Sequence, residues 1–199
     1  MKNIFFLSVF IALILLACSQ APTYVPKPKG FPRIDLPEAS YQALPDSFPY
    51  FFEYSGEATI KKDSSWIAER YWLHLVYPAF GNAEIQITYK DISQDTEKRL
   101  SEHINDSYKL LSKHQIKAYS IEETVFKNAL GQKAMVIELG GEVPSHFQFY
   151  TTDSTHHFLR GAVYLRTATK NDSLDPVIDF IKKDVIHMLN TVRWRAPKP

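Results

Sequence analysis

Four polar residues in the C-terminal half of the chain have side chains capable of acid–base or metal chemistry. Asp153, His156, His157 and Arg160 lie close together in the sequence. Adjacent residues on a strand point to opposite faces, so His156 and His157 cannot chelate one metal ion together. Asp153, His156 and Arg160 are candidates for a small polar binding site, although polar residues at an exposed hairpin tip are the commoner explanation. We therefore predict no metal site here.

The sequence lacks the patterns typical of hydrolases and phosphate-binding enzymes. No serine lies in a G-x-S-x-G motif, and no two carboxylates are paired at a predictable spacing. Gly140 and Gly141 end an expected strand without a following helix, so they do not predict a phosphate loop. We expect no catalytic residues, no cofactor and no small-molecule substrate. A hydrolase or metal enzyme with dispersed ligands is the least favoured alternative.

Cys18 is the only cysteine, and its surroundings favour lipid attachment. After Lys2, an apolar run over residues 4–16 is shorter than the ~20 residues of a membrane-spanning helix and is typical of an export signal. Residues 15–18 read LLAC and resemble the bacterial lipobox, although Leu16 is larger than the residue usual there. An isolated thiol in an oxidising compartment has no disulfide partner. We predict that residues 1–17 are a signal peptide and that Cys18 is acylated.

A proline-rich segment follows the cysteine. Seven prolines lie between residues 21 and 49, and proline lacks a backbone donor, so residues 18–49 are predicted to form an extended tether. Its aromatic and aliphatic residues indicate that the later half packs on the domain. Lys27, Lys29 and Arg33 are candidates for contacts with anionic headgroups, peptidoglycan or a partner, and solubility explains them equally well.

From residue 50 onward the pattern predicts a single domain over residues 50–195, followed by a tail at 196–199. Apolar residues three and four apart predict helices over 95–114 and from Asp175-Pro176 to Trp194. Alternating or β-branched stretches predict strands at 50–60, 66–77, 83–90, 119–127, 133–140, 146–152 and 156–166.

This order of elements, βββαββββα with short hairpin links, predicts an α+β fold. We expect a mostly antiparallel sheet of about six to seven strands covered by two amphipathic helices. Both alternating sets of residues in 66–77 are apolar or aromatic, so that part of the sheet is expected to be covered on both faces. A protein interface is the alternative explanation for the density of aromatic residues there.

Composition and charge exclude nucleic acid as a partner. Hydrophobic residues make up 45% of the chain and aromatic residues 14%, which indicates a well-filled core. The chain has 23 basic and 22 acidic residues, and loss of Lys2 with the signal peptide balances them. Phosphate binding needs a clustered basic excess, which a balanced chain does not provide.

Four blocks of the sequence resemble the gliding-motility lipoprotein D (GldD) family of the Bacteroidota. They are YVPKPKGFPRIDLP at 24–37, DSYKLLSKHQIKAYSIEE at 106–123, FYTTDSTHHFLRGAVYL at 149–165 and DSLDPVIDFIKKDVIHMLNTVRW at 172–194. The resemblance covers nearly the whole chain after Cys18. This chain departs from the family pattern in lacking the cysteines that several members carry near the places of Phe48 and Tyr71-Trp72.

The resemblance implies an outer-membrane lipoprotein that is required for gliding and associated with the type IX secretion and motor apparatus, with no assigned enzymatic activity. Its implied partners are membrane lipid, through acyl chains such as palmitate on Cys18, and other gliding or secretion proteins of the envelope. Surface-exported lipoproteins of this group resemble one another in an acidic cluster after the acylated cysteine. Residues 19–30 contain no acid, so the domain is predicted to face the periplasm. A periplasmic glycan- or small-ligand-binding lipoprotein is the alternative.

Overall fold

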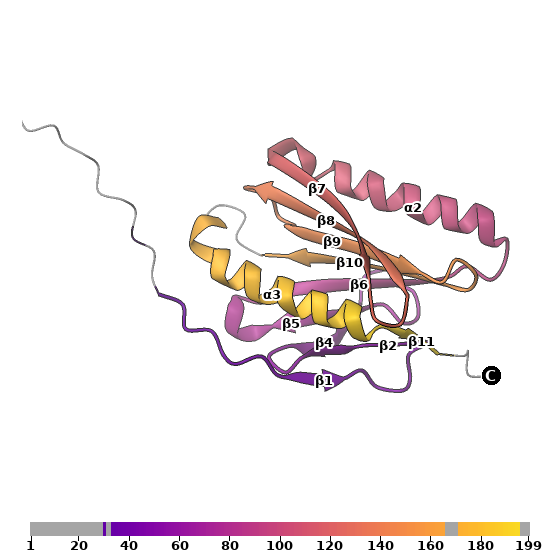
Figure 1. Cartoon of the computed structure of the whole chain (residues 1–199), viewed down its shortest axis with the longest axis horizontal. Coiled ribbons are helices and arrows are strands. Elements are labelled where there is room, and N and C mark those ends of the chain that lie inside the picture. Colours follow the sequence, from indigo (N-terminus) through magenta and orange to yellow (C-terminus); the bar gives the residue numbers. More distant parts are fainter. Residues whose placement is uncertain (1–29, 31–32, 166–170, 196–199) are drawn as a thin grey trace, which may run out of the picture. The chain divides into compact units, whose positions relative to one another are not determined.

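The computed structural model describes Gly30, residues 33–165 and residues 171–195 of the chain. The described residues from Arg33 onward belong to one compact unit. At its centre lies a seven-stranded sheet with the spatial order β4-β5-β6-β10-β9-β8-β7, in which every neighbouring pair is antiparallel (Figure 1). The two hairpin-linked halves of the sheet therefore meet where β6 pairs with β10.

The predicted order of elements is confirmed for this sheet. Three strands precede helix α2 (Thr96–Ser112), and four precede helix α3 (Asn171–Thr191). The strands are β4 (Thr59–Lys62), β5 (Leu73–Tyr77), β6 (Ala83–Asp91), β7 (Ala118–Lys127), β8 (Lys133–Gly141), β9 (Phe147–Thr152) and β10 (His157–Tyr164). Short 3-10 turns, η1 (Pro78–Phe80) and η2 (Gln115–Lys117), precede β6 and β7. The α+β fold class follows from this arrangement.

Two short antiparallel ladders lie beside the main sheet. They pair β1 (Tyr41–Ala43) with β3 (Glu53–Ser55) and β2 (Tyr50–Phe51) with β11 (Arg193–Trp194). Strand β1 lies inside the proline-rich segment, in a stretch without proline that keeps its backbone donors. Ile34, Leu44 and Phe48 pack against the core, so the later half of the proline-rich segment contacts the domain as predicted.

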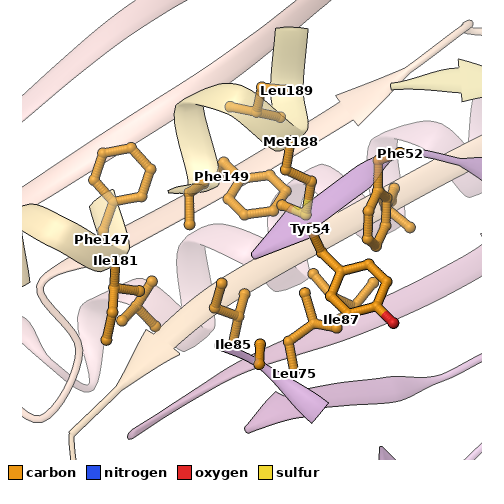
Figure 2. Close-up of a cluster of buried hydrophobic side chains, with 14 of the residues drawn as sticks. Phe52, Tyr54, Leu75, Ile85, Ile87, Phe147, Phe149, Ile181, Met188 and Leu189 are labelled. Carbon is orange, nitrogen blue, oxygen red and sulfur yellow. The ribbon is translucent and has the colours of Figure 1, made fainter. Parts of the chain in front are cut away.

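The main core lies between α3 and one face of the sheet. Figure 2 shows Ile181, Met188 and Leu189 of α3 packed with the rings and branched side chains of the sheet. The helical stripe has apolar residues three and four apart, as predicted, and its buried members are Val177, Phe180, Ile181, Val185, Met188, Leu189 and Val192. At Gly161, a Cβ atom would lie 2.1 Å from Cζ of Phe149, so the glycine makes room for that ring.

The opposite face of the sheet is only partly covered. On β8, Val136 joins the core under α3, whereas Ile137 and Leu139 join a small second cluster with Leu111 of α2 and Val143. Because α2 packs near β8 and β10, the same face of β5 and β6 carries half-buried polar residues, which are His74, Glu84, Gln86, Thr88 and Lys90. At residues 66–77, Val76 on this face is 2% exposed and His74 is half-buried, so the predicted covering of both faces is confirmed in part.

Three expected elements also differ from the structure. The strand expected over 50–60 is divided among β2, β3 and the start of β4. The strand expected over 66–77 is confined to β5, and residues 63–72 form bends and turns that end in a left-handed Tyr71 with φ 77°. Helix α3 begins at Asn171 instead of at Asp175, with Pro176 inside it. Pro176 lacks a backbone N–H and costs the helix one hydrogen bond. Because it lies near the start, this loss does not prevent the helix from continuing.

Candidate functional site

A hollow of about 860 Å³ opens at one end of the sheet, where β6 ends and β10 begins. We name it the hairpin-end pocket. Segments that are far apart in the sequence line it, because the β2–β11 ladder and the turn after residue 63 bring them to the end of the β6–β10 pair. The lining residues are Asp46, Ser47, Phe48, Pro49, Glu69, Arg70, Tyr71, Tyr89, Asp91, Ser93, His156, His157 and Arg195.

Aromatic rings form one wall of this pocket. The ring centroids of Tyr71 and Tyr89 are 5.9 Å apart in an edge-on arrangement, and those of Phe48 and Tyr71 are 6.2 Å apart. The buried Tyr50 hydroxyl donates a 2.6 Å hydrogen bond to the carbonyl oxygen of Tyr71. This bond helps hold Tyr71 in its left-handed conformation, which is costly for a bulky side chain. Such an outlier beside a hollow favours a functional role for Tyr71.

His157 lies at the inner end of the pocket in a fixed orientation. Its ring stacks on Trp194 with centroids 5.1 Å apart, and its Nδ1 is 2.7 Å from the hydroxyl of Tyr89. Burial lowers the pKa of His157 and raises the pKa of Tyr89. The Tyr89 hydroxyl therefore stays protonated and donates a hydrogen bond to Nδ1, which places the ring proton on Nε2, 4.0 Å from the Asp153 carboxylate.

Asp153 organises the hairpin turn beside this histidine. Its Oδ1 accepts hydrogen bonds from the backbone N–H groups of Thr155, His156 and His157, each at 2.9 Å. Burial alone would raise the pKa of Asp153, but these donors outweigh it and hold the pKa below the usual range. The carboxylate is therefore charged at neutral pH, and most of its acceptor capacity is used inside the turn.

Charged groups of both signs surround the mouth of the pocket. Arg195 binds the Asp46 carboxylate at 2.7 Å, and Lys90 pairs with Glu69. Arg70 lies 4.8 Å above the Tyr71 ring and pairs with no carboxylate among the described residues. The backbone N–H of Ser93 lowers the pKa of Asp91, so a charged carboxylate also faces the opening.

The structure brings together two of the residues singled out from the sequence and separates a third. His156 lines the pocket, and its N–H binds Asp153 directly. Arg160 lies on the sheet face toward α2, where its Nη2 donates to Oε1 of the buried Gln148 at 2.9 Å. Four residues of extended chain at about 3.3 Å each separate Arg160 from His156 by about 13 Å, and Arg160 does not line the pocket that His156 lines. The polar site expected from Asp153, His156 and Arg160 is therefore not assembled.

The remaining candidates lie outside this pocket. Arg33 forms an exposed 2.7 Å ion pair with Asp35, an arrangement that contributes little to stability. Cys18, Lys27 and Lys29 lie outside the described residues. Of the helices that the structure describes, none is long and apolar enough to cross a membrane.

The pocket combines aromatic faces with hydrogen-bonding and charged groups, which is the chemistry of a binding site. Within the described ranges, no three His, Cys, Asp or Glu side chains are grouped so that they could hold a metal ion. Ser47 and Ser93 line the pocket, but neither side chain hydrogen-bonds a histidine in the described part of the chain. Without that pairing, the lining contains no serine activated by a base.

Sequence reasoning missed most of this lining. Phe48, Tyr71 and Arg195 converge only through long-range strand pairing, which no local pattern reports. The sequence held one signal for this region. Residues 50–77 are dense in aromatic side chains, and a protein interface was the alternative explanation for that density.

Comparison with known proteins gives the chain a family. None of the curated proteins matches it. Among solved structures, the solution structure of PsbP from the cyanobacterium Synechocystis sp. PCC 6803 aligns with 90% of this chain and 99% of its own, at 13% identity and a TM-score of 0.43. The family model described as gliding motility lipoprotein GldD matches residues 21–194, which includes both ladders and the whole seven-stranded sheet. The chain therefore belongs to the gliding motility lipoprotein GldD family.

Proposed function

We propose that this protein is a noncatalytic component of the gliding motility and type IX secretion apparatus. Acyl chains on Cys18 anchor it to the outer membrane, and the domain binds another envelope protein on the periplasmic side. The observation that carries this proposal is the match to the GldD family over residues 21–194. The hairpin-end pocket supports a binding role, because aromatic side chains and arginine are enriched where proteins bind one another.

Arg70 offers the sharpest test of partner binding at this pocket. It is exposed at the mouth, so a photo-crosslinking residue can replace it without disturbing the core. We expect crosslinks from position 70 to a defined gliding or secretion protein in intact cells. Lys109, which is exposed near the opposite end of α2 from the pocket-lining Ser93, is the matched control and should not give that product.

The same pair of positions tests function. A deletion strain complemented with Arg70→Glu should lose gliding or secretion, whereas Lys109→Glu should restore it. Equal behaviour of the two variants, with no specific crosslink at position 70, would contradict partner binding at the pocket. Thermal unfolding of both purified proteins checks that neither substitution acts through the fold.

Anchoring is tested separately from partner binding. Mass spectrometry of the protein isolated from membranes should find residues 1–17 removed and Cys18 acylated. Cys18→Ala should release the domain from the membrane fraction and abolish complementation while leaving its unfolding temperature unchanged. Protease added to intact cells should leave a periplasm-facing domain intact, so loss of the domain would overturn its orientation.

A periplasmic glycan-binding or small-ligand-binding lipoprotein is the second candidate, and the volume of about 860 Å³ beside aromatic rings favours it specifically. Soluble N-acetylglucosamine oligomers are a suitable probe, and their binding should change the NMR signals of the Tyr71 ring, which lines the pocket. Tyr71→Ala should then abolish binding, and Tyr119→Ala, on the exposed β7 strand, should not. Absence of binding at millimolar probe, together with a specific protein crosslink at position 70, would reject this candidate.

A further inference from the structure

Strand β7 leaves one long side of the sheet unpaired. It is the last strand in the spatial order, and its pairing with β8 is the only strand pairing it makes among the described residues (Figure 1). An edge strand presents alternate N–H and C=O groups to its surroundings, and these groups can pair with a strand of another chain. The edge of β7 is therefore a candidate site for strand addition.

The opposite edge of the same sheet is protected in the usual way. Strand β4 has only four residues and ends in Lys61 and Lys62, both exposed. Short length and lysine side chains are the common means of preventing pairing at an edge. Strand β7 has ten residues, and its only lysine is Lys127 at the far end. The two edges differ in the two properties that control pairing.

The β7 edge also exposes apolar side chains. Tyr119 is 85% exposed, Val125 60% and Ile121 41%. Ile121 and Val125 lie opposite Leu139 and Met135 of β8, so they extend the apolar surface beside α2 out to the edge. A strand added to β7 would cover both of them, and this burial would supply a favourable free energy of binding.

Two glutamates at the centre of β7 determine what kind of strand fits. Glu122 lies opposite Glu138 of β8, and Lys182 of α3 pairs with Glu138. Glu122 itself makes no hydrogen bond or ion pair with the described residues, and like charges opposite each other weaken a ladder. On the other face, Glu123 accepts a 2.8 Å hydrogen bond from the Tyr108 hydroxyl. The middle of the β7 edge is therefore negatively charged, and no basic side chain among the described residues pairs with Glu122.

This charge disfavours a second copy of the chain at the edge. Residues directly opposite each other point to the same face, so antiparallel pairing of two β7 strands about their centre would place Glu122 opposite Glu122 of the other copy, or Glu123 opposite Glu123. Like charges directly opposite each other destabilise a sheet. A strand with lysine or arginine at those positions would instead form two cross-strand ion pairs.

We propose that the β7 edge binds an extended segment of a partner protein by strand addition, with β-branched residues opposite Ile121 and Val125 and basic residues opposite Glu122 and Glu123. Backbone hydrogen bonds supply the pairing, and the side chains select the sequence. The inference rests on the partner-binding role proposed above and gives it a second surface. Its test uses peptides, so it can fail while the crosslinks at position 70 succeed.

The test compares two peptides that differ only in charge. One has the sequence of residues 118–127, and the other carries Glu122→Lys and Glu123→Lys in that sequence. Each is titrated into the full-length chain purified from membranes in detergent, and binding is followed by isothermal titration calorimetry. We expect the lysine peptide to bind at least about tenfold more tightly, because two attractive cross-strand pairs replace two repulsive ones.

Matched variants of the protein locate the binding. Ile121→Lys places a charge on the edge and should abolish binding of the lysine peptide. Ile67→Lys, the same substitution at a site of similar exposure in another part of the molecule, should leave binding unchanged. Glu122→Lys in the protein should remove most of the preference, because each peptide then makes one attractive and one repulsive cross-strand pair. Circular dichroism confirms that each variant is folded.

Several results would overturn the proposal. Equal affinities for the two peptides, no binding of either at millimolar concentration, or binding that survives Ile121→Lys would each reject it. Dimerisation of the chain that Ile121→Lys abolishes would make a second copy the occupant. Binding that appears only after Lys27→Ala and Lys29→Ala would make the tether the occupant.

Discussion

The face of the sheet under α3 and the face under α2 bury side chains to very different extents. Under α3, rings and branched side chains from every strand of the sheet except the two edge strands, β4 and β7, are fully or nearly fully buried with an amphipathic helix of 21 residues. Under α2, Leu111, Ile137, Leu139 and Val143 form a small buried cluster and Phe158 and Ala162 are also buried, but the rest of that face includes half-buried polar residues. One sheet therefore has a structural face and a face with accessible side chains.

This difference shows how a lipoprotein domain can keep surfaces for partners without losing its fold. Stability depends mainly on the apolar area removed from water, and most of that area lies under α3. The hairpin-end pocket and the β7 edge lie at the periphery of the sheet, where substitutions disturb little buried surface. Unfolding experiments can test this division directly.

The largest effect is expected from Phe149→Ala. The Phe149 ring is 1% exposed and lies over Gly161 beneath α3, so its removal leaves a cavity that the glycine cannot fill. We expect a loss of about 3–5 kcal/mol in the free energy of unfolding, measured by urea denaturation of the full-length chain. A loss below about 1 kcal/mol would show that this face is not the structural one.

A smaller effect is expected on the other face from Leu111→Ala. Leu111 is 1% exposed, but its cluster is small and bordered by partly buried residues, so the surroundings can relax. We expect a loss of about 2–3 kcal/mol, in the lower part of the range for buried leucines. Equal losses for Leu111→Ala and Phe149→Ala in the same denaturation series would remove the contrast between the faces.

The α3 side also contains a buried carboxyl group that should make stability depend on pH. Asp184 is 3% exposed, accepts a 3.1 Å hydrogen bond from Tyr77, and has its pKa raised by burial despite nearby hydroxyls and His187. The folded state therefore holds the proton to higher pH than the unfolded chain, whose carboxyl titrates near 3.8. The stabilisation that protonated Asp184 contributes is fully present below pH 3.8. It is lost as the pH rises through the pKa of Asp184 in the folded state.

Asp184→Asn removes this titration and keeps an acceptor for Tyr77. We expect the variant to gain stability relative to the native chain as pH increases from 4 to 7 in a series of urea denaturations. Parallel curves for the two proteins over that range would show that Asp184 does not titrate differently in the folded state.

The smallest effect on stability is expected at the sheet edge. Ile121→Lys replaces a side chain that is 41% exposed, so the free energy of unfolding should change by no more than about 0.5 kcal/mol. A loss of about 2 kcal/mol or more would mean that Ile121 belongs to the buried structure, and β7 would no longer differ from the strands beneath α3.

Much of the fold was predictable because strands and helices have different apolar periods. Residues 83–90 alternate apolar and polar, and they are buried and half-buried in that same alternation in β6. The stripe on α3 and the hairpin formed by β9 and β10 were also predicted correctly, since local sequence specifies both. The strand expected at 66–72 failed because its apolar residues resemble those of a strand, whereas Tyr71 adopts a left-handed turn held by Tyr50.

The candidate site was much less predictable. Sequence proximity placed Asp153 and His156 together correctly, since the hairpin turn is local. Arg160 does not join them, because it lies further along β10 and its guanidinium binds the buried Gln148. Phe48, Tyr71 and Arg195 could not be found at all, since no short-range pattern connects residues that meet through strand pairing.

The sequence by itself determined the signal-like amino terminus with its single cysteine, the order of elements and the apolar stripes that make an α+β sheet. Each of these depends on neighbouring residues or on a short period. Only the tertiary structure decided which strands form the edges, which face stays accessible and which distant residues line the pocket. Those properties depend on pairing between segments far apart in the chain, where contacts are selected by the packing of the whole domain.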